Sequence, residues 1–265
     1  MILADPQLTE SSGVVRSRHI PGVLFTINDS GNQPIVFATD TSGRAIGTWL
    51  VPTVRNRDWE SISAGPCPGG SCLYFGDTGD NREQQEYVVV YRVREPRKLA
   101  RFLGATDASP LDLDSLVLSY PDGPHDVEAM YLDDAGTLFL VSKGRTKGAL
   151  HFRIPRSAWS RRGVVRPELL GSLPLPSRNS GDWVTDAARR PGGREVVVRT
   201  YNALYFFTMG ADGRLEVAAP APACEVTGLE AQGEGVDWLD PTHLVLTSER
   251  GLFPAGTLRT IQCSP

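Results

Sequence analysis

One order of short apolar segments recurs five times along the chain, and this repetition limits the possible folds more than any other feature. The units open with SSGVVRS, WESISAGP, VEAMYLDD, VTDAARRP and GEGVDWLD. After a turn, each unit continues with an apolar segment: VLFTINDSG, CLYFGDTGDN, TLFLVSKGR, EVVVRTYN or HLVLTSERG. Such runs of Val, Ile, Leu, Tyr and Phe, separated by Gly, Pro, Asp and Asn, are typical of strands and turns. The sequence therefore predicts an all-β fold.

The spacing of the units distinguishes between two all-β architectures. If Ser12, Glu60, Glu128, Thr185 and Glu234 are equivalent positions, successive units are separated by 48, 68, 57 and 49 residues. Repeats of about 40–50 residues are typical of propeller blades, in which insertions fall in loops. The longest interval contains EPRKLARFLGATDASPLD, which we interpret as an inserted loop. An antiparallel sandwich is the alternative, since several short strands also fit that fold.

The two ends of the sequence complement each other. The last unit ends after its third segment, GTLRTIQC, and the N-terminal segment MILADPQLT has no unit of its own. Closing a ring with this segment removes an unpaired sheet edge. We therefore predict a five-bladed β-propeller with four antiparallel strands per blade, closed by the N-terminal strand. It is a single domain, 1–265, with blades at roughly 10–55, 56–121, 122–178, 179–223 and 224–265 plus 1–9.

An oxygen-bearing side chain occupies the equivalent position in the first strand of every unit. The five residues are Ser12, Glu60, Glu128, Thr185 and Glu234. Because inner propeller strands converge, we expect these side chains to meet at the central channel. Three glutamates about 6 Å apart repel by roughly 2.8 kcal/mol per pair at an effective dielectric constant of about 20. Either a cation lies among them or some are protonated.

The chemistry of this ring points to one class of metal. Oxygen ligands without histidine or cysteine favour Ca²⁺ over zinc or copper, and Mg²⁺ prefers to keep its waters. We therefore predict an axial calcium held by the five residues, with Asp186 as an alternative to Thr185. In the other interpretation, the glutamates bond backbone amides or waters and no metal is bound.

Polar residues follow the second segment of each unit and predict a polar mouth on one face of the ring. The mouth carries Asn28, Asp29, Asp77, Asp80, Asn81, Lys143, Arg145, Arg199 and Glu249. We interpret Lys143, Arg145, Arg199 and Glu249 as ligand-binding residues. Turn chemistry alone is the alternative for the Asp and Asn residues, since tight turns favour them. Trp59, Trp183 and Trp238 lie beside the first segments and are interpreted as packing anchors between blades.

Four cysteines bear on the compartment in which the chain works. The repeat order favours the pairs Cys67–Cys72 and Cys224–Cys263, the second tying the start of the last blade to its end. Disulfides form in oxidising compartments, so these pairs predict an extracytoplasmic protein, secreted or periplasmic. Four free thiols in a cytosolic protein are the alternative.

Charge and hydropathy exclude two kinds of partner. The chain has 27 basic and 31 acidic residues, a net charge of −4, and its basic clusters SRRGVVR and ARRPGGR are short. A nucleic-acid surface needs a concentrated basic face, so we expect no nucleic-acid partner. No apolar run is long enough to predict a transmembrane segment. We expect a monomer.

The motifs also resemble a known family. ESSGVV…LFTIN, WESIS…LYFGD, VEAMY…LFLVSKG and EGVDW…LVLTSE resemble the SdiA-regulated family of bacterial five-bladed propellers. They are similar, more distantly, to the calcium-activated nucleotidases (apyrases), five-bladed propellers with a central calcium. The similarity covers nearly the whole chain as a pattern of short motifs. It implies that inner-strand polar residues hold calcium: Ser12, Glu60, Glu128, Thr185 and Glu234.

The nucleotidase resemblance implies an activity as well. Apyrase-like sites place basic residues after the second strands of the middle blades, so Lys143 and Arg199 would bind phosphate and Arg145 would add a bidentate contact. Asp29 or Asp77 would then orient a water as catalytic residue. The short loops of this chain depart from the apyrase pattern.

Two functional hypotheses follow. The first is an extracytoplasmic calcium-binding propeller whose axial calcium is structural and whose mouth binds a small-molecule or protein ligand. The second is a calcium-dependent phosphohydrolase acting on nucleotides or other phosphoesters. Calcium-dependent release of phosphate separates them.

Overall fold

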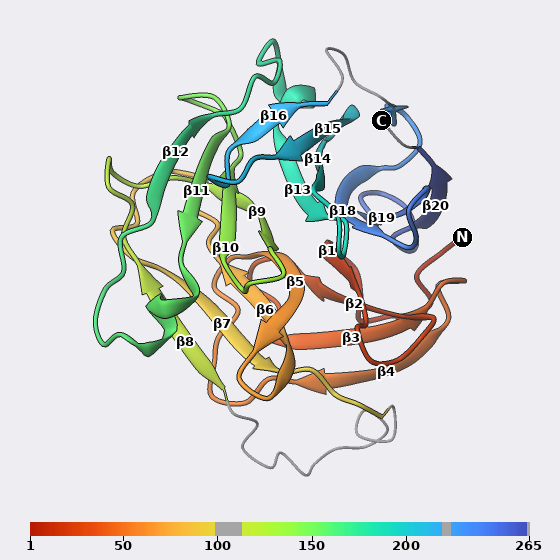
Figure 1. The fold of residues 1–265 in the computed structure, drawn as a ribbon. Coiled ribbons are helices and arrows are strands. Elements are labelled where there is room, and N and C mark those ends of the chain that lie inside the picture. Colours follow the sequence, from red (N-terminus) through yellow and green to blue (C-terminus); the bar gives the residue numbers. More distant parts are fainter. Residues whose placement is uncertain (99–112, 219–223, 264–265) are drawn as a thin grey trace.

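The computed structural model describes residues 1–98, 113–218 and 224–263. These residues form five small antiparallel sheets arranged around a common centre (Figure 1). Most of the predicted inserted loop, residues 99–112, lies outside the described residues. The described helices are two short 3₁₀ turns, Arg156–Ser160 and Ser180–Asp182, neither of them long enough to cross a membrane.

The first three sheets each contain four strands joined in sequence order. The first sheet comprises β1 (Ser11–Arg16), β2 (Val23–Asn28), β3 (Ile35–Asp40) and β4 (Ala45–Leu50). The second comprises β5 (Trp59–Cys67), β6 (Gly70–Asp77), β7 (Val88–Arg94) and β8 (Asp114–Leu118). The third comprises β9 (Val127–Leu132), β10 (Leu138–Ser142), β11 (Leu150–Ile154) and β12 (Glu168–Ser172).

The last two sheets differ slightly from this plan. The fourth comprises β13 (Val184–Arg189), β14 (Glu195–Thr200), β15 (Ala203–Met209) and β16 (Leu215–Val217), with β17 (Cys224–Glu225) also paired to β15. The fifth comprises β18 (Gln232–Trp238), β19 (His243–Glu249) and β20 (Leu258–Gln262). We refer to the five sheets as blades 1 to 5.

The first strand of each blade lies innermost. β1, β5, β9, β13 and β18 contact one another in cyclic order, and β18 also contacts β1, so the ring is closed (Figure 1). The predicted five-bladed β-propeller is therefore confirmed.

The N-terminal residues complete blade 5. Ile2 forms an antiparallel bridge with Thr257. The Leu258 amide donates to the Met1 carbonyl at 3.0 Å, and the Leu3 amide donates to the Gly256 carbonyl at 3.0 Å. These bonds pair the N-terminus with residues 256–258 at the start of β20, so residues 1–3 close the ring as predicted from the missing fourth segment.

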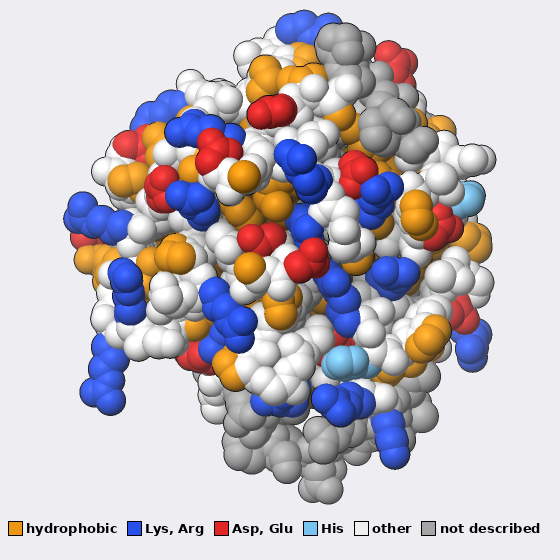
Figure 2. Space-filling view, in the orientation of Figure 1, with side chains coloured by type: hydrophobic (Ala, Val, Ile, Leu, Met, Phe, Trp, Pro, Cys, Tyr) orange, Lys and Arg blue, Asp and Glu red, His pale blue; other side chains and the backbone are white. Residues whose placement is uncertain are grey.

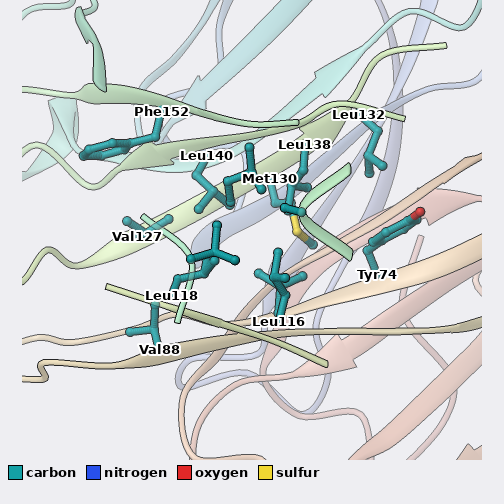
Figure 3. Packing of buried hydrophobic residues seen from close by; sticks show 14 of the residues in the cluster. Tyr74, Val88, Leu116, Leu118, Val127, Met130, Leu132, Leu138, Leu140 and Phe152 are labelled. Carbon is teal, nitrogen blue, oxygen red and sulfur yellow. The ribbon is translucent and has the colours of Figure 1, made fainter. Parts of the chain in front are cut away.

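Hydrophobic packing between neighbouring blades holds the ring together. The described residues form five hydrophobic clusters, each joining two adjacent blades. Figure 3 shows the cluster between blades 2 and 3, where Leu116 and Leu118 face Met130, Leu138 and Leu140. Side chains alternate along a strand, so successive residues pack against opposite neighbours. Both faces of every blade are thereby buried, which explains the nearly continuous apolar segments of the sequence.

Two of the three predicted tryptophan anchors lie in these interfaces. Trp59 is fully buried and stacks on Phe75, with ring centroids 5.2 Å apart. Trp238 is also buried and packs against Phe206 at 5.8 Å. Trp183 lies outside the hydrophobic clusters: this side chain is only half-buried and contacts blade 3 through the Arg145 guanidinium, 4.7 Å from the ring centroid.

Both predicted disulfides are present. The Cα atoms are 5.8 Å apart in Cys67–Cys72 and 6.4 Å apart in Cys224–Cys263. The repeat order places Cys224 at the start of the last blade, whereas in the structure it lies in β17, paired with β15 of blade 4. The second disulfide therefore joins blade 4 to the end of blade 5.

The two disulfides are expected to contribute unequally to stability. Replacing Cys224 and Cys263 with serine should lower the free energy of unfolding by about 4 kcal/mol, because the bond spans a separation of 39 residues. The same change at Cys67 and Cys72, with a separation of 5, should cost about 2 kcal/mol. Urea unfolding followed by tryptophan fluorescence measures both. A larger loss from the Cys67–Cys72 pair would contradict the prediction.

Candidate metal centre

The inner strand of each blade contains a register shift at the predicted ring position. Glu60 has no partner between the pairs Trp59–Asp77 and Ser61–Gly76. The other shifts fall at Ser12–Gly13, Glu128, Thr185 and Glu234–Gly235. A β-bulge leaves its extra residue out of the ladder and re-aims its side chain. The five positions are therefore structurally equivalent, in agreement with the alignment from sequence.

All five ring side chains are buried, but their contacts differ. The Ser12 hydroxyl lies 3.3 Å from both the backbone oxygen and Oε2 of Glu60. The Thr185 hydroxyl donates to the Glu234 backbone oxygen at 3.0 Å. The Glu234 carboxylate accepts from Gln232 Nε2 at 2.9 Å. Ser12 and Thr185 thus link neighbouring inner strands.

Carboxylates from three blades gather around Glu60. Ligand atoms of Asp29, Asp58 and Glu60 all lie within 4.8 Å of one another, and so do those of Glu60, Asp126 and Glu128. We call these five residues the central acidic cluster. Asp29 follows β2, Asp58 and Asp126 precede β5 and β9, and the glutamates occupy bulges. Such clustered acidic residues can hold a metal ion.

Lys143 and Arg145 balance one side of the cluster. The Lys143 Nζ atom lies 2.5 Å from Glu128 Oε1 and 4.0 Å from Asp126 Oδ2. Arg145 Nη2 lies 3.5 Å from Asp126 Oδ2 and donates to Asn81 Oδ1 at 2.5 Å. Asp126 Oδ2 is buried without a hydrogen bond.

The other side of the cluster has no such balance. Among the described residues, no lysine or arginine nitrogen lies within 4.0 Å of a carboxylate oxygen of Asp29, Asp58 or Glu60. The acidic charge is therefore least compensated around these three residues.

Burial and mutual repulsion raise the pKa of several carboxyls near the centre. Burial, with Asp29 and Asp126 nearby, raises the pKa of Asp58 to about 6. Burial raises the pKa of Glu128 to about 7 against the opposing effect of Lys143. Burial and the Glu128 charge raise the pKa of Glu234 to about 8. The pKa of Glu60 also lies well above its ordinary value, chiefly through burial and then through Glu128.

Gly79 provides the space in which two of the carboxylates lie. A Cβ atom at this position would stand 2.4 Å from Glu60 Oε1 and 2.5 Å from Asp58 Oδ2. Real Cβ atoms do not approach other heavy atoms so closely, so a side chain here would displace the carboxylates. The second glycine of FGDTGDN, Gly79, is therefore needed for this close approach.

The remaining predicted mouth residues lie in other surroundings. Arg199 does not reach a polar mouth: it is fully buried, and its Nη1 donates to the backbone oxygens of Gly235 and Thr247 at 2.6 and 3.0 Å. Asp77 is buried and accepts from the Asp58 amide at 2.8 Å, a local structural contact. Glu249 accepts from Gln232 Nε2 at 2.7 Å.

Three residues near the centre were not predicted from the sequence. Asp58 and Asp126 each lie two residues before an aligned glutamate, in Asp58-Trp-Glu60 and Asp126-Val-Glu128. This repeated acidic spacing was the available signal. Tyr201 follows β14 directly, as Lys143 follows β10, and burial together with the Glu234 charge raises its pKa.

Figure 2 shows acidic and basic side chains interspersed over the displayed face. Lysine and arginine side chains are spread among acidic ones, and no single basic patch dominates the described residues of this face.

Comparisons with known proteins support the fold. No protein family matches the sequence, and no curated protein is similar enough in sequence to count as a relative. The PQQ-bound aldose sugar dehydrogenase of Streptomyces coelicolor has a similar structure, with a TM-score of 0.54, 13% identity and coverage of 99% of this chain and 97% of that one. At such identity the likeness concerns the fold alone.

Two further solved structures show the same likeness. The GH43 endo-arabinanase of Bacillus licheniformis has a TM-score of 0.53 at 11% identity, covering 97% of this chain and 94% of that one. A protein of unknown function from Bacteroides thetaiotaomicron also has a TM-score of 0.53 at 11% identity, covering 94% of this chain and 55% of that one.

The raised pKa values predict that the cation-free protein loses stability as pH rises from about 6.5 to about 8.5. The folded chain keeps protons on Glu128, Glu249 and Glu234, whose pKa values are about 7, 7 and 8, after the unfolded chain has released them. The pKa of buried His151 is lowered to about 4, so this residue makes the fold more stable as pH rises toward the ordinary histidine pKa of about 6.5. It has no further effect above that pH. Urea unfolding in EDTA across this range measures the slope, which Glu234→Gln should reduce. Constant or rising stability would contradict the prediction.

Proposed function

We propose that this chain is an extracytoplasmic calcium-binding β-propeller whose cation lies in the central acidic cluster. The cation offsets the charge of carboxylates from blades 1, 2 and 3 and thereby fixes these blades relative to one another. The polar residues around it bind a small-molecule or protein ligand.

The observation that carries this proposal is the uncompensated group of Asp29, Asp58 and Glu60. Their ligand atoms lie within 4.8 Å of one another. At that separation and an effective dielectric constant of about 20, two ionised carboxylates repel by about 3 kcal/mol. A divalent cation at this position would replace the repulsion with attraction, whereas protonation would only remove it.

The donor set favours calcium among the available cations. All five members of the central acidic cluster offer carboxylate oxygens, and neither group includes histidine or cysteine. Calcium accepts six to eight oxygen ligands in adjustable geometry, with water completing its shell. Lys143 neutralises the Glu128 side, so the preferred position is beside Asp29, Asp58 and Glu60. The ring residues Ser12, Thr185 and Glu234 then act by supporting the inner strands, with Glu128 shared between the lysine and the cluster.

The two disulfides support the proposed compartment. The described structure contains no free cysteine. Disulfides persist in oxidising surroundings and are uncommon in the cytosol. A secreted or periplasmic location also supplies calcium at concentrations sufficient for a site of modest affinity.

The resemblances to the SdiA-regulated family and to apyrases remain proposals about ancestry. No described contact favours the phosphohydrolase alternative. Lys143 is paired with Glu128, and Arg199 is buried between blades 4 and 5, where Nη2 contacts Glu230. We therefore propose the binding function alone.

Calcium is expected to raise the melting temperature of the protein, and EDTA is expected to reverse the shift. Glu60→Gln should abolish most of the response, because Glu60 belongs to both acidic groups. Differential scanning calorimetry across a calcium titration measures the shift, and isothermal titration calorimetry gives the affinity.

The matched control for this experiment is Glu95→Gln. Glu95 is also a buried carboxylate, but it accepts from Ser17 Oγ and the Arg18 amide at 2.7 Å and is in neither acidic group. This variant should keep the calcium response even if its baseline stability falls. A wild-type protein that shows neither a melting shift nor binding heat at millimolar calcium would refute the proposal.

Gly79→Ala should weaken calcium binding by about tenfold or more, which is about 1.4 kcal/mol, because the added methyl group displaces Asp58 and Glu60. Gly210→Ala adds the same group at a turn of blade 4 that is in neither acidic group. Titration calorimetry compares the two. Equal affinity in both variants would show that these carboxylates do not hold the ion.

A further inference from the structure

A second polar site lies at the junction of blades 4 and 5. A pocket of about 320 Å³ opens there, between the ends of β14 and β18. The residues that line it include Ser180, Tyr201, Asn202, Glu230, Gln232 and Gly233. None of these belongs to the central acidic cluster, although Tyr201 also lies near Lys143 and Glu234 at the centre of the ring.

The pocket contains hydrogen-bonding groups that the protein does not use. Glu230 Oε1 is buried without a hydrogen-bond partner, and the Glu230 side chain is only 2% exposed. Within the described part of the chain, no hydrogen bond is formed by the hydroxyls of Ser180 and Tyr201 or by the Asn202 side-chain amide. A buried carboxylate oxygen without a donor is costly, so a ligand that donates to it binds favourably.

The charge of the pocket selects the kind of ligand. The other Glu230 oxygen, Oε2, pairs with Nη2 of Arg199, which is fully buried. Gly233 permits this contact, because a Cβ atom there would overlap Arg199 Nη2 and stand 2.8 Å from Glu230 Oε2. The pair is neutral overall. Because Arg199 offsets the charge of Glu230, this pair gives the pocket no net charge to attract an ionic ligand, and a neutral hydrogen-bond donor matches it.

We propose that this pocket binds a neutral polyhydroxylated compound, a sugar or related polyol. One ligand hydroxyl donates to Glu230 Oε1, and others bond the Asn202 amide and the Ser180 and Tyr201 hydroxyls. Hydroxyls donate and accept, and amide and hydroxyl side chains match them in both roles. The volume lies at the lower end of the range of about 300–1,000 Å³ that is typical of small-molecule sites.

The pocket is joined to the centre of the ring through one side chain. Gln232 lines the pocket, and its Nε2 donates to Glu234 at 2.9 Å and Glu249 at 2.7 Å. A polyol in the pocket would therefore lie beside the start of β18, and Gln232 alone would separate it from the ring residue Glu234.

The test uses the full chain and saturation-transfer NMR with a panel of neutral polyols: monosaccharides, disaccharides, myo-inositol and glycerol. Ethanolamine and inorganic phosphate serve as cationic and anionic probes. We expect at least one neutral polyol to bind, both in calcium and in EDTA. Calorimetry then gives its affinity for the variants.

Two variants alter different walls of the pocket. Asn202→Leu should weaken polyol binding by about tenfold or more, since it removes an amide and fills space. Ser180→Val should weaken polyol binding several-fold. If circular dichroism shows that Asn202→Leu does not fold, Ser180→Val serves as the test of the pocket. The control Gln33→Leu adds the same apolar side chain at an exposed turn of blade 1 and should bind normally.

The outcomes are distinct. Absence of binding by every polyol, binding only by a charged probe, or unchanged affinity in both pocket variants would overturn the proposal. Polyol binding in a protein that gives no calcium response would leave the pocket established and refute the calcium site alone. A calcium response without polyol binding would do the reverse.

Discussion

Repulsion among buried carboxylates is the constraint around which the centre of this propeller is arranged. Five inner strands converge, and a bulge in each turns one polar side chain out of the ladder. Where that side chain is a glutamate, its buried negative charge needs a compensating partner. Lys143 forms an ion pair with Glu128 at 2.5 Å, and the Gln232 side chain donates a hydrogen bond to Glu234. Glu60 has only the Ser12 hydroxyl, 3.3 Å from its Oε2, and among the described residues no lysine or arginine nitrogen lies within 4.0 Å of its carboxylate or those of Asp29 and Asp58.

The ring divides into two regions with different electrostatics. Blades 1 to 3 contribute the acidic cluster, where like charges meet. Blades 4 and 5 contribute a neutral buried pair, Arg199 and Glu230, beside an open pocket. The same backbone plan thus carries the proposed cation site and the pocket that we propose binds an uncharged ligand.

The repeat pattern was sufficient to predict the propeller, its N-terminal closure, both disulfides and the five equivalent inner positions. Short sequence motifs were insufficient where a difference of one residue in the end of a strand changes the surroundings of a side chain. β14 continues to Thr200, so Arg199 lies inside the strand and points into the blade interface, whereas Lys143 lies just beyond β10. Asp58 and Asp126 precede their strands, and only the fold brings them beside Glu60. Trp183 lies next to a strand yet stacks under Arg145.

Blade 5 is the seam of the ring, since both described ends of the chain meet there (Figure 1). Backbone hydrogen bonds from residues 1–3 join blade 5 to the N-terminal segment before blade 1, and the Cys224–Cys263 disulfide joins blade 5 to blade 4. A reductant releases the covalent fastening and leaves the hydrogen-bonded one intact. Opening of the ring should then begin between blades 4 and 5, at the pocket, while the acidic region stays assembled.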